Sequence, residues 1–216
     1  MAKIAMVAGE ASSDQLAAHL IGALKQHLPD AKFYGIGGPK MQREGFESLW
    51  PAETLAVRGY AEVLRHYRAI TAMRRQLLRR LLKDRPDVFI GVDGSDFNLW
   101  LEKRLKRSGI PTIHFVSPSI WAWRKNRMDK IIQSVSHILA LYPFEPDLYK
   151  GTAVKCSYVG HPLADVIPLE IDQRAVRERL DVAADRPVIA LLPGSRQSEL
   201  YFMAETFVET AKLLLE

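Results

Sequence analysis

The sequence predicts an α/β protein in which helices flank a parallel β-sheet. Short runs rich in β-branched residues alternate along the chain with longer segments whose apolar residues recur every three or four positions. Turns rich in Gly, Ser and Asp separate the two kinds of segment, a pattern typical of βαβ units. In addition, the run 88–92 is apolar throughout, as expected of a strand covered on both faces.

Strands are predicted over 4–8, 32–36, 88–92, 112–116, 138–142 and 154–159. Helices are predicted between them, among others over 62–83 and 97–107. The helix that follows the first strand is expected to begin with a capping box made by Ser12 and Gln15.

The chain is expected to divide into a first domain over 1–165, a linker over 166–186 and the start of a second domain over 187–216. Prolines and polar residues interrupt the pattern in the linker. A strand over 188–192 and a helix from about Ser198 would then open a new βα unit that the chain does not complete. We therefore expect a piece of a longer protein. Residues from 187 onward would be poorly packed, borrowed by another copy or laid on the first domain.

The composition is that of an ordinary globular chain. The 216 residues are 48% hydrophobic and 25% charged, which excludes disordered and fibrous classes. Cys156 is the single cysteine, so we expect neither an intramolecular disulfide nor a metal site, and a reducing compartment. The apolar run at the N-terminus ends at Glu10 and is too short for a signal peptide or a membrane span. The net charge of +5 admits nucleic acid, an anionic membrane or phosphorylated ligands as partners.

Two loops that join a predicted strand to a predicted helix favour anion binding. They are GEASSD at 9–14, with Ser12, and LLPGSR at 191–196, with Gly194, Ser195 and Arg196. The free N–H groups at a helix start attract phosphate, and Arg196 would add a charged clamp. Neither loop has the GxGxxG pattern of a dinucleotide site. The alternative for both is a turn that caps a helix and binds nothing.

Asp93 is the candidate general base. It comes directly after the apolar strand 88–92, and ligands of open α/β sheets bind beyond the carboxyl ends of the strands. A carboxylate in that place suits proton abstraction. Asp96 and Asn98 fall at the start of the next helix, where such side chains commonly cap N–H groups. A capping role is also the alternative for Asp93.

The loop after the predicted strand 112–116 carries Ser117 and two tryptophans. Trp121 and Trp123 would stack on a sugar ring or line an acyl pocket, and Arg124 beside them suits a phosphate. The alternatives are core anchors for the tryptophans and a solvated helix face for the arginine. His161 is interpreted as a structural histidine, because a lone histidine usually is one.

The segment 61–83 combines a cationic face with an apolar one. The cations considered are Arg68, Arg74, Arg75, Arg79 and Arg80, and the apolar stripe includes Ile70, Leu77, Leu78, Leu81 and Leu82. This arrangement favours docking on anionic lipid. The alternative is an ordinary surface helix whose stripe packs on the sheet.

Together these stretches resemble the bacterial lipid-A-disaccharide synthases. The strings GEAS, GIGGPKM, LAVRGYAEVL, DFN, VSPSIWAWR, PFEP, VGHPLAD and LLPGSR occur in the order of that family, from about Lys3 to Arg196. The resemblance implies a GT-B glycosyltransferase with two Rossmann-like domains, an acceptor side first and a UDP-sugar side second, and no cofactor. It further implies an inverting transfer from UDP-2,3-diacylglucosamine to 2,3-diacylglucosamine 1-phosphate, which makes the lipid A disaccharide of Gram-negative bacteria.

The same resemblance implies roles for single residues. Asp93 matches the base of the family, and Ser12 and Arg196 match residues of its nucleotide-sugar site. The chain departs from the family at Ser13, where GEASGD has glycine, and at 94–95, where DAPDFN has Ala-Pro and this chain has Gly-Ser. Both departures change the backbone freedom of a loop at the site.

The acylated substrates imply a peripheral protein on the cytoplasmic face of the inner membrane, held to an anionic surface. A homodimer is admitted, nucleic acid is not expected, and residues 1–216 alone are expected to be inactive. Two alternatives stay open: a UDP-sugar epimerase of similar build, and a non-catalytic module that docks on membranes and binds phospholipid. Epimer formation from a UDP-sugar alone would indicate the first. Strong liposome binding that no Asp93 substitution affects would indicate the second.

Overall fold

The structure, a computed structural model, describes residues 1–52, 55, 60–120, 127–194 and 197–214, with only the backbone for 60–67, 197 and 198. The chain forms two compact units, Met1–Ile167 and Pro168–Glu216.

The first unit is built on a seven-stranded sheet in the order β3-β2-β1-β4-β5-β6-β7, in which every neighbouring pair is parallel. Its strands are β1 Lys3–Ala8, β2 Lys32–Ile36, β3 Glu47–Trp50, β4 Val88–Val92, β5 Thr112–Phe115, β6 His137–Ala140 and β7 Lys155–Tyr158. The strand order runs in one direction from β1 to β3 and in the other from β4 to β7. The topological switch point therefore lies between β1 and β4, and the prediction of a parallel α/β sheet is confirmed.

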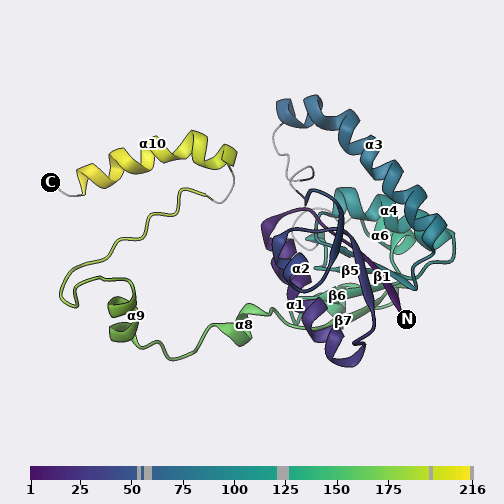
Figure 1. The fold of residues 1–216 in the computed structure, drawn as a ribbon, viewed down its shortest axis with the longest axis horizontal. Coiled ribbons are helices and arrows are strands. Elements are labelled where there is room, and N and C mark those ends of the chain that lie inside the picture. Colours follow the sequence, from purple (N-terminus) through teal and green to yellow (C-terminus); the bar gives the residue numbers. More distant parts are fainter. Residues whose placement is uncertain (53–54, 56–59, 121–126, 195–196, 215–216) are drawn as a thin grey trace. The chain divides into compact units, whose positions relative to one another are not determined.

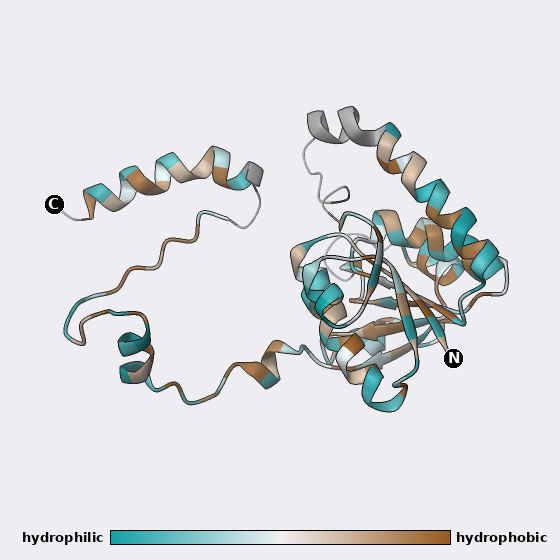
Figure 2. Cartoon of the chain, viewed as in Figure 1, coloured by the Kyte–Doolittle hydropathy of each residue, from teal (hydrophilic) through white to brown (hydrophobic). Residues whose placement is uncertain are grey.

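Helices cover both faces of this sheet (Figure 1). They are α1 Ala11–His27, α2 Pro39–Arg43, α3 Tyr60–Asp84, α4 Ser95–Arg107, α6 Met128–Ser134 and α7 Glu145–Leu148, and the short helix α8 Leu163–Val166 follows the last strand. Side chains of β1 alternate between the two faces: Met6 packs in the cluster that α1 covers, and Val7 packs in the cluster that α3 and α4 cover. The sheet is accordingly largely brown, that is hydrophobic, in Figure 2.

The start of α1 differs from the expected capping box. The helix begins at Ala11, so Glu10 is the N-cap and Ser13 is the third helical residue. The backbone N–H of Glu10 donates to Oγ of Ser13 at 3.0 Å, and the side chain of Glu10 accepts from the backbone N–H of Ser13, so the two residues form a capping box. The prediction of a box made by Ser12 and Gln15 is wrong by two residues at each end, and Ser12 is exposed.

The strand β3 and the helix α2 are not among the predicted elements. Each has at most five residues, which is too short for a periodic pattern to show. β3 is an edge strand of the sheet, and α2 follows directly after Gly38.

The second unit contains α9 Gln173–Arg179 and α10 Gln197–Leu213. No strand forms among its described residues, so the prediction of a strand over 188–192 is wrong. A parallel strand needs neighbours for its N–H and C=O groups, and this part of the chain supplies none. Its apolar side chains are exposed, among them Val188 (59%), Leu192 (78%) and Phe202 (73%).

Candidate functional site

Asp93 follows β4 at the carboxyl edge of the sheet, beside the switch point between β1 and β4. Its backbone N–H donates to the carbonyl of Phe115 at the end of β5, at 2.8 Å. Its side chain is partly exposed. Open α/β sheets bind ligands at this position, so the structure brings the predicted base to the expected edge.

The backbone at this edge is strained. Asp93 has φ +52°, Gly94 has φ +49°, and Val116, after β5, has φ +78°. Positive φ is unfavourable for non-glycine residues and most of all for a β-branched one. Such residues cost of order 1–3 kcal/mol each and cluster at functional sites. Gly94 adopts the left-handed conformation without that cost.

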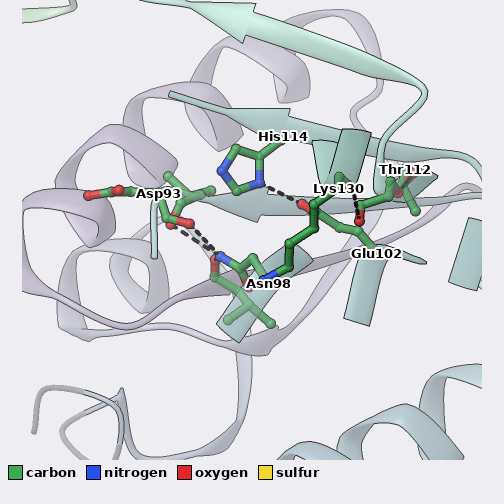
Figure 3. Close-up of polar contacts among 9 residues, drawn as sticks. Asp93, Asn98, Glu102, Thr112, His114 and Lys130 are labelled. Carbon is green, nitrogen blue, oxygen red and sulfur yellow. Dashed lines mark hydrogen bonds and ion pairs between the residues drawn. The ribbon is translucent and has the colours of Figure 1, made fainter. Parts of the chain in front are cut away.

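The side chain of Asn98 contacts the backbone of the turn at Asp93 (Figure 3). It is 1% exposed. Its Nδ2 donates to the carbonyl of Asp93 at 2.8 Å and lies 3.4 Å from that of Val7 and 3.5 Å from that of Val92. One amide therefore joins the carboxyl ends of β1 and β4.

One turn further along α4, Glu102 pairs with His114 of β5. Both side chains are 0% exposed, and His114 Nδ1 lies 2.7 Å from Glu102 Oε1. Burial raises the pKa of Glu102, and the contact with His114 opposes this increase. We call Asn98, Glu102 and His114 the Asn98 cluster. Among the described residues, Asn98 Oδ1, Glu102 Oε2 and His114 Nε2 find no hydrogen-bond partner.

A small cavity of about 110 Å³ opens beside the cluster. It lies between the loop after β1 and the start of α4, and its lining includes Gly9, Glu10, Ser13, Gly94, Phe97 and Asn98. The departures at Ser13 and Gly94 therefore both border this cavity.

Ser117 is buried and bonds to a residue beyond its own loop. Its Oγ lies 2.8 Å from Oη of Tyr149, and nearby Glu145 accepts from the backbone N–H of Tyr142 at 3.0 Å. Burial raises the pKa of Tyr149 to about 12 and also raises the pKa of Glu145. We call Ser117, Glu145 and Tyr149 the Tyr149 cluster. It fixes the loop after β5, a role that the sequence does not distinguish from ligand binding.

The other candidates are spread over the chain. The side chain of Asp96 is 80% exposed, and its Oδ1 forms an ion pair with Nη2 of Arg127 at 3.1 Å. Gly194 belongs to the second unit and has φ +130°. His161 accepts from the backbone N–H of Leu163 at 3.2 Å, as a structural histidine does. Five predicted residues lie outside the described residues: Trp121, Trp123, Arg124, Ser195 and Arg196.

Asp14 is a buried carboxylate to which the sequence assigned no role. Its Oδ1 accepts from the backbone N–H groups of Gly38 (2.9 Å) and Met41 (3.1 Å), and its Oδ2 accepts from that of Lys40 (3.0 Å). The side chain of α1 thereby caps the start of α2. Asp14 is the fourth residue of α1, and its partners lie 24 to 27 residues further along the chain, so no local pattern signals the contact.

The described part of α3 separates into two faces. Leu77 and Leu81 are 0% exposed and pack on the sheet, as the alternative of an ordinary surface helix predicts for them. Arg74 lies over the ring of Trp100, with Cζ 4.2 Å from its centroid. The other arginines of the predicted patch, Arg68, Arg75, Arg79 and Arg80, are exposed. The coloured part of α3 carries teal, hydrophilic residues between brown, hydrophobic ones in Figure 2.

Neither a metal site nor a membrane-crossing helix is found in the described ranges. No group of three or more His, Cys, Asp or Glu side chains there could hold a metal ion. No helix there combines the length and the apolar character needed to cross a bilayer.

The fold of this chain is similar to parts of two solved glycosyltransferase-fold structures. The chain superposes on the crystal structure of Arabidopsis thaliana UGT89C1 complexed with UDP with a TM-score of 0.52 and 16% identity, covering 85% of this chain and 55% of that one. It superposes on Glycyrrhiza uralensis UGT73P12 with the same TM-score and 11% identity, covering 74% of this chain and 48% of the other. The Rossmann-like α/β fold is therefore that of the GT-B glycosyltransferases.

The chain belongs to the lipid-A-disaccharide synthetase family, whose model matches residues 4–216. It is 63% identical over 214 residues to the lipid-A-disaccharide synthase of Dechloromonas aromatica, which covers 99% of this chain and 56% of the relative. It is 54% identical over 213 residues to that of Neisseria meningitidis serogroup B, with 99% and 56% covered. The chain thus spans about half the length of these curated relatives, and its resemblance to the family is confirmed.

Proposed function

We propose that this chain is the acceptor-side part of an inverting glycosyltransferase. The complete protein would condense UDP-2,3-diacylglucosamine with 2,3-diacylglucosamine 1-phosphate to the lipid A disaccharide. Family membership and the fold support the proposal. The single observation that carries the site is the strained, partly exposed Asp93 at the switch point of the sheet.

In this proposal the carboxylate of Asp93 takes the proton from the 6-hydroxyl of the acceptor. The oxygen attacks the anomeric carbon of the donor while the bond from that carbon to UDP breaks, and UDP leaves with the bonding electrons. One displacement converts an α-linked donor into a β-linked product, so a single carboxylate suffices. The transition state resembles an oxocarbenium ion, and negative charge grows on the leaving UDP.

The leaving group would be stabilised by charge and by helix starts. We assign this role to Arg196, with Ser195 and Gly194 in the same loop, because the sequence there joins a Gly-Ser turn to α10. Ser12 is exposed in the first turn of α1, where free N–H groups also favour a phosphate.

The test replaces Asp93 in the full-length protein by Ala and by Asn. Both variants should fold and bind lipid normally, and turnover should fall by about 100-fold or more, the scale of a general base. Asp147→Asn is the matched control, because Asp147 is a 70% exposed carboxylate on α7 that pairs with Lys150. Near-normal turnover in the Asp93 variants would contradict the assignment.

We further propose that the protein attaches to the cytoplasmic face of the inner membrane through the exposed arginines of α3. Each cation near an anionic surface is worth about 1 kcal/mol. Arg75→Gln with Arg79→Gln should therefore weaken binding to vesicles of anionic phospholipid by about 2 kcal/mol and leave binding to neutral vesicles unchanged. Arg174→Gln with Arg177→Gln, which removes the same charge from α9, is the control. An equal loss of binding to anionic vesicles in the α3 and α9 double variants would rule out attachment through the α3 arginines.

A further inference from the structure

Asn98 is built into the fold as a donor to backbone carbonyls rather than to a ligand. It is the fourth residue of α4 and is 1% exposed. A carboxamide NH₂ has two hydrogens, and here three carbonyl oxygens face it: those of Asp93, Val92 and Val7. The shortest of these contacts, at 2.8 Å, is to the carbonyl of Asp93 itself.

The turn at Asp93 needs such a donor. Asp93 and Gly94 both have positive φ, a conformation in which an L-residue is held only when its surroundings determine it. The N–H of Asp93 is fixed by Phe115, and its C=O is fixed by Asn98. With both backbone groups held, the direction in which the side chain leaves the sheet edge is set.

The rest of the Asn98 cluster holds the amide in turn. Gly91 makes room for it: a Cβ at this position would lie 2.3 Å from Oε1 of Glu102 and 2.9 Å from Cβ of Asn98. Glu102 is itself fixed by His114 at 2.7 Å. The cluster keeps three buried polar atoms without a partner among the described residues, which costs stability. A fold retains such a cost mainly where a site needs the arrangement.

We propose that Asn98 is the positioning residue of the site. It contacts no substrate; through the carbonyls at the ends of β1 and β4 it fixes the turn that aims the carboxylate of Asp93 at the acceptor hydroxyl. This inference rests on the proposed function, in which Asp93 is the base.

The test is a double-mutant cycle in the full-length protein. Asn98→Ala should lower kcat by about 10- to 100-fold, the effect of misplacing a reacting group by about an ångström, while KM for both substrates stays within about twofold. In the Asp93→Ala background the same substitution should lower kcat no further, because there is no base left to position. Asn98→Ser, which keeps a hydroxyl donor, should give an intermediate kcat and serves if the alanine variant does not fold.

Leu99→Ala is the matched control. Leu99 is the next residue of α4 and is 1% exposed, but it packs in the cluster with Ile131 and Ile138. It should lower thermal stability and leave kcat unchanged. Equal kcat losses for Asn98→Ala and Leu99→Ala, or a loss that adds to that of Asp93→Ala, would overturn the positioning role alone. Near-normal turnover of Asp93→Ala would overturn the proposed function together with it.

Discussion

The Asn98 cluster and the Tyr149 cluster are both buried beneath loops at the carboxyl edge of the sheet, yet they differ in how their polar atoms are satisfied. In the Tyr149 cluster the two hydroxyls bond each other and Glu145 accepts from the backbone. In the Asn98 cluster three polar atoms have no hydrogen-bond partner among the described residues. Unsatisfied buried polar groups lower stability by about 1–3 kcal/mol each. This difference agrees with the proposal that the Asn98 cluster serves the site at the expense of stability, whereas the Tyr149 cluster serves stability.

The largest effect should come from breaking the buried pair. His114→Ala leaves Glu102 buried without its partner, which should lower the free energy of unfolding by about 3–5 kcal/mol at pH 7. Burial already raises the pKa of Glu102 above 4.5, and loss of His114 raises it further. Because the pKa of Glu102 is higher in the folded protein than in the unfolded one, its contribution to stability is fully present below the unfolded pKa. That contribution is lost as the pH rises through the folded pKa. Urea unfolding should therefore show a deficit that shrinks toward about pH 4.5.

Glu102→Gln supplies the control for that pH dependence. The substitution keeps the shape of the side chain and removes the titrating carboxyl. The unsubstituted protein loses stability at high pH through Glu102 and the variant does not, so the stability difference between them should be smallest at high pH. A deficit of His114→Ala that is the same at pH 5 and pH 8 would show that Glu102 is not the source.

An intermediate effect should follow from closing the space at Gly91. Gly91→Ala places Cβ against two side chains that cannot withdraw, because both are fully enclosed. Overpacking of this kind costs about 1–3 kcal/mol. Gly22→Ala is the control with the opposite sign: its Cβ would meet only Glu44 at 3.5 Å, and alanine in a helix gains up to about 1 kcal/mol over glycine. Thermal unfolding of the two variants separates steric strain from backbone entropy.

The smallest effect should come from the Tyr149 cluster, whose polar groups are hydrogen-bonded. Tyr149→Phe removes one hydrogen bond to Ser117, worth about 1 kcal/mol. The raised pKa of Tyr149, about 12, gives stability that is present below about pH 10 and lost as pH rises toward 12. The variant should therefore lose less stability than the unsubstituted protein across this interval. Tyr142→Phe, at a 49% exposed position, should leave the alkaline loss unchanged.

The position of Asp93 could be predicted from the sequence, whereas the function of the residues beneath it could not. An apolar run followed by an acidic turn indicates the end of a buried strand, and the rule for ligand sites in parallel sheets supplies the rest. From its neighbours in the sequence alone, Asn98 is predicted to be a helix cap. Its contact with Val7 joins residues 91 positions apart in the chain, and no local pattern contains such a contact.

One signal for the buried pair was present. His114 lies in TIHF, a short interior strand of a parallel sheet, where both faces are buried and a polar side chain must find a partner. That the partner is Glu102 depends on how α4 packs on the sheet. For α3, the hydrophobic stripe correctly predicted a helix, but its period does not tell whether lipid or the sheet covers it.

The three amides that Asp14 holds have a consequence for how the sheet edge moves. N–H groups at the start of a helix ordinarily exchange their hydrogens with solvent quickly, because no carbonyl of the helix protects them. Those of Gly38, Lys40 and Met41 are bonded to one carboxylate that is 3% exposed. They can open only if α1 and α2 separate. Their deuterium uptake should accordingly be slow and synchronous, and the two helices should travel as one rigid piece whenever the loops at this edge rearrange.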